Sequence, residues 1–198
     1  MVRYADDAVF TFRSIADAER FQIMLVQRLA EFGIQVNEAK TKVMLSGPKE
    51  AERHAGLGLR MPSFSFLGFL HVWGISVNRK TGNRFWRVKK RTCPERYRQK
   101  LAEMKSFVRK HRHQKDLIAR VTRVVQGYLN YFAVTDNFKR ISQFVYEVRR
   151  LLFKWLNRRS QRRSFTWEQF GKLLLKLSFP QARILRNPFY DSRPTVYR

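Results

Sequence analysis

The sequence predicts an α+β protein, in which a β-hairpin, a helix and short antiparallel strands over residues 1–90 precede an all-α bundle over residues 91–180. Three observations support this division. Apolar, β-favouring residues flank a pair of acids near the start of the chain, and apolar residues recur every three or four positions after Thr92. Positive charge also rises sharply from the first part to the second. Residues 181–198 are expected to form a C-terminal tail.

The first predicted element is a β-hairpin with two acids at its tip. Tyr4-Ala5 precedes Asp6 and Asp7, and Ala8-Val9-Phe10 follows them, so β-favouring segments lie on both sides of the acids. Adjacent acids in a turn are commonly ordinary solvated turn residues. They also suit divalent metal ions that hold a phosphoryl group, because Mg²⁺ prefers carboxylate oxygens. The two residues alone leave both interpretations open.

A helix over about residues 15–32 follows the hairpin. The segment Ser14-Ile15-Ala16-Asp17 is typical of a capping box at a helix N-terminus. Phe21, Leu25 and Phe32 then fall near one face, and Gly33 is expected to end the helix. This order of hairpin and helix indicates a small sheet with a helix packed on it.

Irregular and extended segments are predicted between this helix and residue 90. Short strands are expected at residues 34–36 and 42–45, on either side of a turn at Asn37. Residues 46–62 form a connection longer than most in compact domains, which suggests mobility or contact with a partner.

Three further strands are predicted after this connection. Residues 64–70 and 72–77 are typical of paired strands, and residues 78–83 of a turn that leads to another strand at residues 85–88.

Four helices are predicted in the second part of the chain. Pro94 fits the first turn of a helix that continues to about Lys110, and His111-Arg112-His113 is expected to be a short exposed link. Apolar stripes at helical spacing cover residues 117–132 and 141–155. Thr166-Trp167-Glu168-Gln169 forms a second capping box, which opens a last helix that ends before Pro180. Because the aromatic residues of these stripes share the helical spacing, most of them are expected to lie in the core.

The charge balance indicates a polyanionic partner. The chain has a formal net charge of +26 on 198 residues. Residues 1–83 carry 11 Lys and Arg against 8 Asp and Glu, whereas residues 84–198 carry 30 against 7. Such a surface binds phosphates by releasing their counterions. This composition argues against an ordinary metabolic enzyme.

Other features exclude several classes of protein. The single cysteine, Cys93, cannot form an internal disulfide, and no Cys/His cluster has the spacing of a zinc site. We therefore expect a reducing, cytoplasmic location. No signal peptide and no window of roughly 18 apolar residues is visible, so a membrane partner is not expected.

Four sequence blocks resemble group II intron-encoded reverse transcriptases, in the order of that family. Tyr4-Ala5-Asp6-Asp7 resembles the catalytic motif of the polymerase palm, and residues 34–42 resemble the next palm block, where a Lys-Thr pair follows an Asn. Phe66-Leu67-Gly68-Phe69 is similar to the hairpin that grips the primer end. Residues 127–132 and 155–159 are similar to the maturase-specific thumb region. The resemblance implies a partial palm over residues 1–90 and a helical thumb, or maturase-specific domain, over residues 91–180.

The resemblance also implies roles for individual residues. Asp6 and Asp7 would be ligands of Mg²⁺ in two-metal nucleotide transfer, and Lys40, or else Lys42, would neutralise or protonate the departing pyrophosphate. The hairpin at Phe66, Leu67, Gly68 and Phe69 would position the primer strand. The basic helices would hold intron RNA or a template–primer duplex, together with the DNA product strand, through the backbone. The residues predicted to contact nucleic acid are Arg87, Lys89, Lys90, Arg91, Arg120, Arg123, Arg149, Arg150, Arg158, Arg159, Arg162 and Arg163.

One departure from the family is large. In these polymerases the fingers and a further catalytic aspartate precede the Tyr-Ala-Asp-Asp motif, whereas here that motif begins at Tyr4. We therefore expect the chain to polymerise DNA only when an N-terminal reverse-transcriptase half completes it in trans, and an apolar palm face to be uncovered. The alternative is a non-catalytic, basic RNA-binding module in which the Asp-Asp hairpin is vestigial. Arg-rich helix faces can also be merely solvated.

Overall fold

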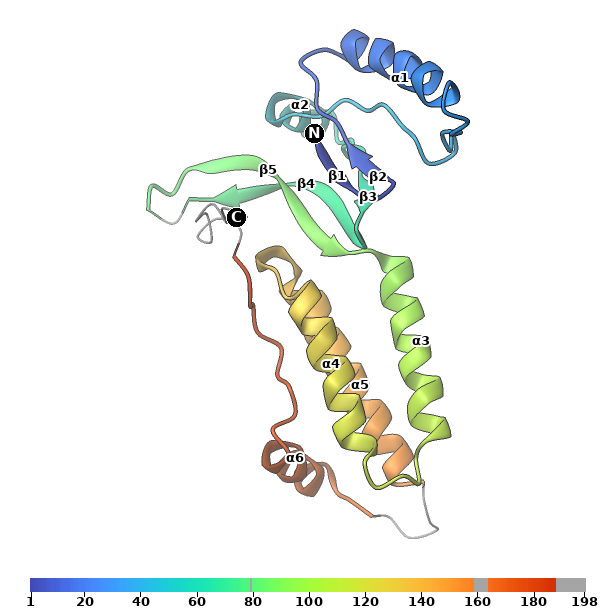
Figure 1. Ribbon diagram of the computed structural model, residues 1–198. Helices are drawn as coiled ribbons and strands as arrows, with labels where there is room; N and C mark the ends of the chain where they lie inside the picture. Colours follow the sequence, from blue (N-terminus) through green and yellow to red (C-terminus); the bar gives the residue numbers. More distant parts are fainter. Residues whose placement is uncertain (79, 159–163, 188–198) are drawn as a thin grey trace, which may run out of the picture. The chain divides into compact units, whose positions relative to one another are not determined.

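The structure is a computed structural model that describes residues 1–78, 80–158 and 164–187 (Figure 1). The chain forms two compact units. The first unit comprises Met1–Leu67 and His71–Lys89, and the second comprises Gly68–Leu70 and Lys90–Arg198. Helices and small antiparallel sheets are both present, which confirms the predicted α+β class.

The first unit opens with the predicted hairpin. Strand β1 (Val2–Tyr4) pairs antiparallel with β2 (Asp7–Val9), so that Val2 faces Val9 and Tyr4 faces Asp7. Ala5 and Asp6 form the two-residue turn. Ala5 has a φ of 52°, a left-handed conformation that costs an alanine about 1–2 kcal/mol. The turn therefore stores strain directly beside the two acids.

Helix α1 (Ile15–Ala30) begins with the predicted N-cap residue Ser14, but the predicted capping box forms only in part, because the Asp17 carboxylate accepts from the Ser14 hydroxyl and not from its backbone N–H. The Ser14 hydroxyl accepts a hydrogen bond from the Asp17 backbone N–H at 3.1 Å and donates one to the Asp17 carboxylate at 2.7 Å. At the other end Gly33 has a φ of 70° and its N–H donates to the Ala30 carbonyl, a geometry that ends a helix with a glycine. The helix packs on the chain after the hairpin through Phe21, whose ring lies 4.7 Å from that of Phe10.

The strands predicted at residues 34–36 and 42–45 are wrong. The structure has irregular chain there, with a turn in which the Asn37 carbonyl accepts from the Lys40 and Thr41 N–H groups. A strand needs a neighbour, and in the described residues the hairpin sheet contains β1 and β2 alone.

The long connection also differs from the prediction. Residues 46–62 contain helix α2 (Pro48–Gly56), which begins with Pro48 in its first turn, where a missing N–H costs nothing. The side chain of Ala51 on this helix is buried.

A three-stranded sheet, β3–β4–β5, follows. It consists of β3 (Phe64–Phe66), β4 (Phe69–Val77) and β5 (Arg84–Thr92). The predicted strand over residues 64–70 is interrupted, because Leu67 and Gly68 have φ values of 49° and 73° and close a tight hairpin. The predicted turn before β5 is confirmed by the Asn78 N–H, which donates to the Asn83 carbonyl at 2.8 Å.

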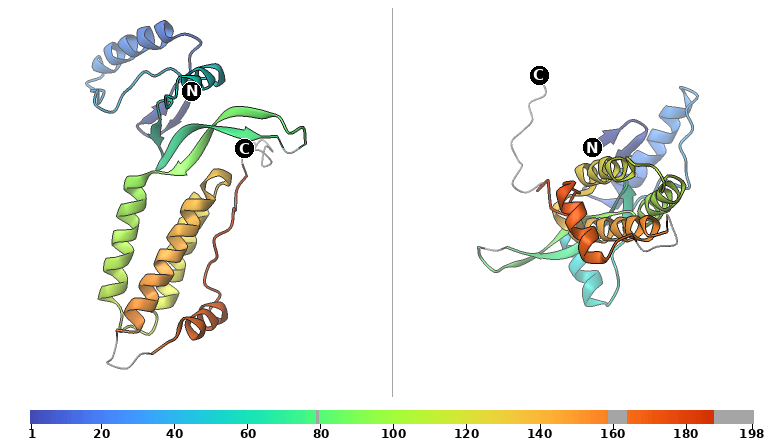
Figure 2. Two further views of the ribbon diagram at one scale, coloured as in Figure 1. Left: turned by 180° about the vertical axis from the view of Figure 1, so that it is seen from behind. Right: turned by 90° about the horizontal axis from the view of Figure 1, so that it is seen from below.

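The second unit is the predicted helical bundle. Helices α3 (Pro94–Lys110), α4 (Leu117–Phe132) and α5 (Phe138–Leu156) contact one another and run side by side in Figure 2. A short 3₁₀ helix, η1 (Thr135–Asn137), joins α4 to α5, and α6 (Trp167–Lys176) follows. The Thr166–Gln169 capping box at the start of α6 is confirmed.

The hydrophobic core of the described residues lies in this second unit. Phe144 and Phe170 are fully buried, and Tyr128 stacks on Phe144 with ring centroids 3.8 Å apart. Burying each large apolar side chain contributes on the order of 2–3 kcal/mol. The prediction that most aromatics of the helical stripes lie in the core holds for Tyr128 but not for Tyr131, which is half exposed. Among the described residues, the largest fully buried hydrophobic side chains are Val108, Leu117, Val121, Val125, Leu129, Ile141, Phe144, Val148, Leu152, Leu156 and Phe170.

A buried polar contact fixes the end of β5 to the bundle. The Asn137 side chain accepts from the Thr92 N–H at 2.8 Å and donates to the Thr92 hydroxyl at 2.7 Å and to the Phe132 carbonyl at 2.9 Å. The segment after α6 returns to the same region, where the Leu185 N–H donates to the Ala133 carbonyl. Both contacts join residues more than 40 positions apart.

The first unit has little core of its own. Among its described residues only Ala51 is buried, while several large apolar side chains are more than half exposed: Val2, Tyr4, Ile23, Met24, Phe32, Ile34, Leu57 and Leu59. None of the helices in the described ranges has the length and hydropathy that a membrane span requires.

Candidate nucleic-acid interface

Asp6 and Asp7 lie where the hairpin turns. Asp6 is in the turn and Asp7 is the first residue of β2, so the prediction that both lie at the tip holds to within one residue. The Arg3 guanidinium donates to the Ala5 carbonyl at 2.9 Å and holds the turn. Both acids are exposed, and neither forms an ion pair within the described part of the chain. Their oxygens are therefore accessible to a cation from solvent.

The hairpin offers part of a ligand set for Mg²⁺. This ion takes oxygen ligands and is held in phosphoryl-transfer sites by one or two carboxylates together with substrate phosphates and water. Two adjacent carboxylates fit that chemistry. Over residues 1–78, 80–158 and 164–187 no group of three or more acids, histidines or cysteines is close enough to hold a metal by itself.

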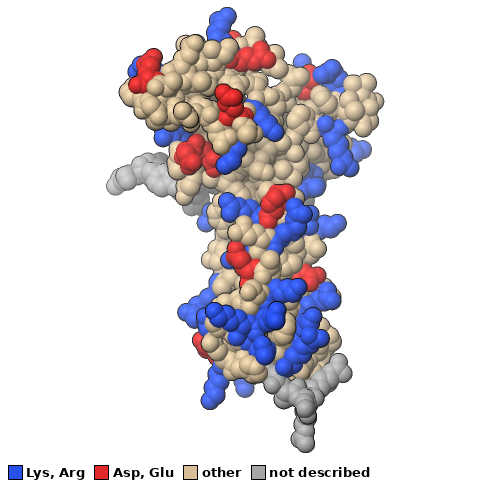
Figure 3. Space-filling model, turned by 90° about the vertical axis from the view of Figure 1, so that its right-hand side faces the viewer, with Lys and Arg blue, Asp and Glu red and all other residues tan. Residues whose placement is uncertain are grey.

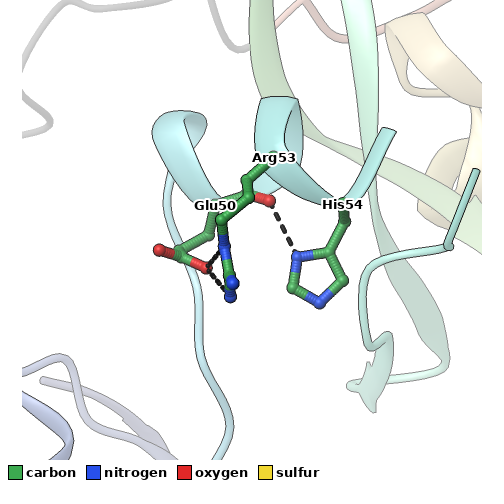
Figure 4. A network of polar contacts seen from close by, with 3 residues as sticks. All are labelled: Glu50, Arg53 and His54. Carbon is green, nitrogen blue, oxygen red and sulfur yellow. Dashed lines mark hydrogen bonds and ion pairs between the residues drawn. The ribbon is translucent and has the colours of Figure 1, made fainter. Parts of the chain in front are cut away.

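Glu50, another acid of the first unit, is already neutralised. Its carboxylate accepts from the Arg53 guanidinium at 2.8 and 3.0 Å, and the Glu50 carbonyl lies 2.9 Å from Nδ1 of His54 (Figure 4). These contacts are all within α2. They stabilise that helix by pairing residues three and four positions apart and leave Glu50 unsuited to metal binding.

Lys40 is positioned by its backbone alone. Its N–H donates to the Asn37 side chain at 3.2 Å, and its own side chain is exposed. No ion pair joins Lys40 to Asp6 or Asp7 in the residues that the structure describes. The structure thus places Lys40 in an ordered turn but does not bring its ammonium to the acids.

The Phe66-Leu67-Gly68-Phe69 block forms the turn between β3 and β4. Its second half belongs to the second unit, where the Gly68 carbonyl accepts from the Cys93 N–H at 2.9 Å. Phe69 stacks on Tyr131, with centroids 5.6 Å apart, and lies against Phe132. The hairpin is as predicted, but Phe69 is engaged in packing, so a role in gripping a primer would fall to the turn backbone.

Some of the predicted nucleic-acid contacts are engaged within the chain, and others are exposed. Arg87 donates to the Ser76 hydroxyl at 2.6 Å, and Lys89 to the Ile75 carbonyl at 2.6 Å. Arg120 lies over the Phe107 ring, and Arg150 forms a 3.5 Å ion pair with Glu147. Arg149 is half-buried, and the exposed members are Lys90, Arg91, Arg123 and Arg158. Arg159, Arg162 and Arg163 lie outside the described residues.

The structure groups further cations that the sequence analysis did not single out. The charged groups of Arg109, Arg112, Lys154 and Arg158 all lie within 6.0 Å of the centroid of the Trp155 ring. The signal for this cluster was present in the order of the helices. Because α3 and α5 are separated by one antiparallel helix, their C-terminal ends lie at the same end of the bundle (Figure 1).

Figure 3 shows the consequence for the surface. On the face where α3 lies, Lys and Arg side chains of the second unit outnumber the Asp and Glu side chains between them. This agrees with the counts of 30 and 7 for residues 84–198.

Comparison with known families accounts for both units. Residues 1–71 match the family model described as reverse transcriptase (RNA-dependent DNA polymerase), and residues 95–172 match the group II intron, maturase-specific domain. Comparison with curated proteins and with solved structures gives no significant match. The chain therefore joins a reverse-transcriptase region to a maturase domain. It belongs to the group II intron reverse transcriptase/maturase family and corresponds to the C-terminal part of such a protein.

Proposed function

We propose that the chain binds intron RNA through its helical unit, assists splicing as a maturase, and contributes Asp6 and Asp7 to a two-metal DNA polymerase site when a fingers-bearing segment completes it. The observation that carries this proposal is the pairing of a maturase-specific domain with 30 Lys and Arg against 7 Asp and Glu over residues 84–198. Uncompensated basic surfaces of this kind bind nucleic acid through phosphates.

The polymerase half of the proposal assigns chemistry to the first unit. Asp6 and Asp7 would hold Mg²⁺, which supplies charge neutralisation at the triphosphate and the primer hydroxyl. Lys40 would donate a proton to the leaving pyrophosphate or neutralise its negative charge. The exposed apolar side chains of the first unit support completion by another segment, because an apolar surface of this kind is a typical protein-binding surface.

A primer-extension assay tests the polymerase half. The chain is combined with the N-terminal half of a polymerase of this family, Mg²⁺, an RNA template and a DNA primer. We expect extension that Asp6→Asn reduces to the level seen without Mg²⁺. Glu19→Gln, which removes the same charge from an exposed site on α1, serves as the control and should retain extension. Equal activity of Asp6→Asn and Glu19→Gln would contradict the proposal.

A second candidate function is RNA binding without catalysis. In the described residues Asp6 and Asp7 are not joined by a third acid, histidine or cysteine that could hold a metal with them, and this favours the second function. In that case the chain binds RNA with a steep salt dependence, but no combination with a fingers segment yields extension.

A further inference from the structure

We propose that Arg109, Arg112, Lys154 and Arg158 form a phosphate-binding cage around Trp155, which holds the sugar–phosphate backbone of an RNA strand. We call these four cations and the indole the Trp155 cage. The inference rests on the proposed RNA binding and goes beyond it, because it names the site and its mode of recognition.

The cage is built from the ends of two helices. Arg109 is in the last turn of α3 and Arg112 is in the link after it, while Lys154 and Trp155 are in the last turn of α5. The charged groups lie 6.0, 5.9, 5.9 and 5.7 Å from the Trp155 ring centroid, for Arg109, Arg112, Lys154 and Arg158 respectively. No two of them are therefore more than about 12 Å apart.

The positive charge of the cage is not balanced by this chain. None of the four cations forms an ion pair with a carboxylate in the described part of the chain. The C-terminal ends of α3 and α5 attract cations, but each helix end is equivalent to only about half a negative charge. Two helix ends thus offset roughly one of four positive charges. Attraction to one indole ring is weak at exposed sites and cannot hold four like charges together by itself.

The position of the indole points to the backbone of a nucleic acid and not to its bases. Trp155 is only partly exposed, and its N–H is buried without a hydrogen-bond partner. All four charged groups lie within 6.0 Å of the ring centroid, so a base that stacked on the ring would have to displace cations. Arg109, Lys154 and Arg158 are exposed, whereas Arg112 is half-buried and donates one hydrogen bond to the Arg109 carbonyl at 3.1 Å. The other N–H groups of Arg112 and the charged ends of the three exposed side chains can bind phosphate oxygens.

The composition of the cage suits phosphodiesters. Three of its four cations are arginines, whose planar guanidinium groups bind phosphate oxygens through two parallel hydrogen bonds. At an axial rise of roughly 3.4 Å per phosphate of one strand, a cluster up to about 12 Å across spans about three to four consecutive phosphates. We therefore expect recognition of the backbone without sequence preference.

Matched variants of the full chain test the cage. The cage variant replaces Arg109, Arg112, Lys154 and Arg158 with Gln. The control variant replaces Arg96, Lys139, Arg183 and Arg186 with Gln, and so removes the same three Arg and one Lys from exposed positions. Arg96 and Lys139 lie in the first turns of α3 and α5, at the other ends of the helices that build the cage. Fluorescence anisotropy measures binding to a 20-base-pair RNA duplex and to a DNA duplex of the same sequence between 50 and 300 mM salt.

We expect the cage variant to bind the RNA duplex at least tenfold more weakly than the control variant. The slope of log Kd against log salt concentration should fall by about 2–3 in the cage variant and by less than 1 in the control. If the unaltered chain binds RNA and both variants weaken equally, the proposed function stands and the cage is refuted. If the unaltered chain does not bind RNA, the proposed function and the cage are both refuted. A loss confined to the DNA duplex would also refute the cage as an RNA site.

A fold control and a direct readout complete the test. Circular dichroism should show that the cage variant is folded at the temperature of the binding assay, because none of the four replaced side chains is buried. If the fall in RNA affinity of the cage variant is no larger than the fraction of that variant that is unfolded, the proposal is contradicted. In a chain labelled with 5-fluorotryptophan, the ¹⁹F resonance of Trp155, assigned with Trp155→Phe, should shift when RNA is added. An unshifted Trp155 resonance at saturating RNA would overturn the proposal.

Discussion

Replacing Asn137 with Ala should destabilise the helical unit by about 3 kcal/mol. The Asn137 side chain is 1% exposed and makes three hydrogen bonds, to the Thr92 N–H, the Thr92 hydroxyl and the Phe132 carbonyl. A typical intramolecular hydrogen bond contributes about 1 kcal/mol net, and a buried group left without a partner costs about 1–3 kcal/mol. Three lost bonds therefore give about 3 kcal/mol as a lower estimate, since Ala leaves the Thr92 N–H and the Phe132 carbonyl without this partner.

Urea unfolding followed by circular dichroism at 222 nm measures this loss. Thermal unfolding gives a second measure. For a unit of this size each kcal/mol of lost stability lowers Tm by about 4 °C, so Asn137→Ala should lower Tm by about 12 °C. Asn130→Ala is the matched control, because Asn130 is exposed and its side chain accepts a hydrogen bond from Gln126 on the same helix. We expect the control to change the free energy of unfolding by less than about 0.5 kcal/mol, as most surface substitutions do.

A double-mutant cycle sharpens the prediction. Thr92→Val removes the hydroxyl but keeps the N–H, and should cost about 1 kcal/mol. Because Asn137 and Thr92 contact each other, the double variant should lose about 1 kcal/mol less than the sum of the single losses. A cost for Asn137→Ala below about 1 kcal/mol, or additive losses, would refute the structural role of this contact.

Three further predictions concern single side chains of the bundle and its junction. Burial raises the pKa of Tyr128 to about 12, so its neutral form stabilises the folded state fully below pH 10, and this stabilisation is lost as the pH rises to 12. Tyr128→Phe should therefore remove about 2 kcal/mol of the alkaline loss of stability between pH 9 and pH 12, and identical pH profiles in urea unfolding would contradict this. Thr166→Ala removes the capping box of α6 and should cost about 1 kcal/mol, with faster amide exchange in α6, whereas Ser164→Ala should change neither. Gly68→Ala should lower stability by about 1 kcal/mol because Gly68 has a φ of 73°, whereas Gly171→Ala, inside α6, should be neutral or stabilising.

Local elements were predicted from the sequence where short-range chemistry decides them. The helix caps at Ser14 and Thr166 involve atoms three residues apart. The Thr166 capping box forms in full, and Ser14 caps α1 through the Asp17 N–H. The helices of the bundle were predicted from apolar residues at a spacing of three and four. This spacing makes one face of a helix apolar, however the helices are arranged around one another. The family resemblance carried by Tyr4-Ala5-Asp6-Asp7 and the thumb blocks agrees with the two family models that match the chain.

Strand boundaries were predicted less well, because strands depend on distant neighbours. Residues 34–36 and 42–45 have β-favouring side chains but no partner strand in the described sheets, so they remain irregular. The hairpin turn at Leu67-Gly68 lacks the usual Asn-Gly signal, and its left-handed Leu67 is visible only in the backbone.

The sequence by itself determined the class of the fold, the order of its elements, the pair of acids in the first turn and the excess of positive charge after residue 83. These follow from residue type and local spacing, which act within a few positions of the chain. The tertiary structure alone decided which cations share one site. Arg109 and Arg158 stand 49 positions apart in the sequence, yet both lie within 6.0 Å of the Trp155 ring centroid, because helix packing brings the ends of α3 and α5 together. The same holds for Asn137 and Thr92, whose hydrogen bonds exist only after the chain has closed a loop of 45 residues.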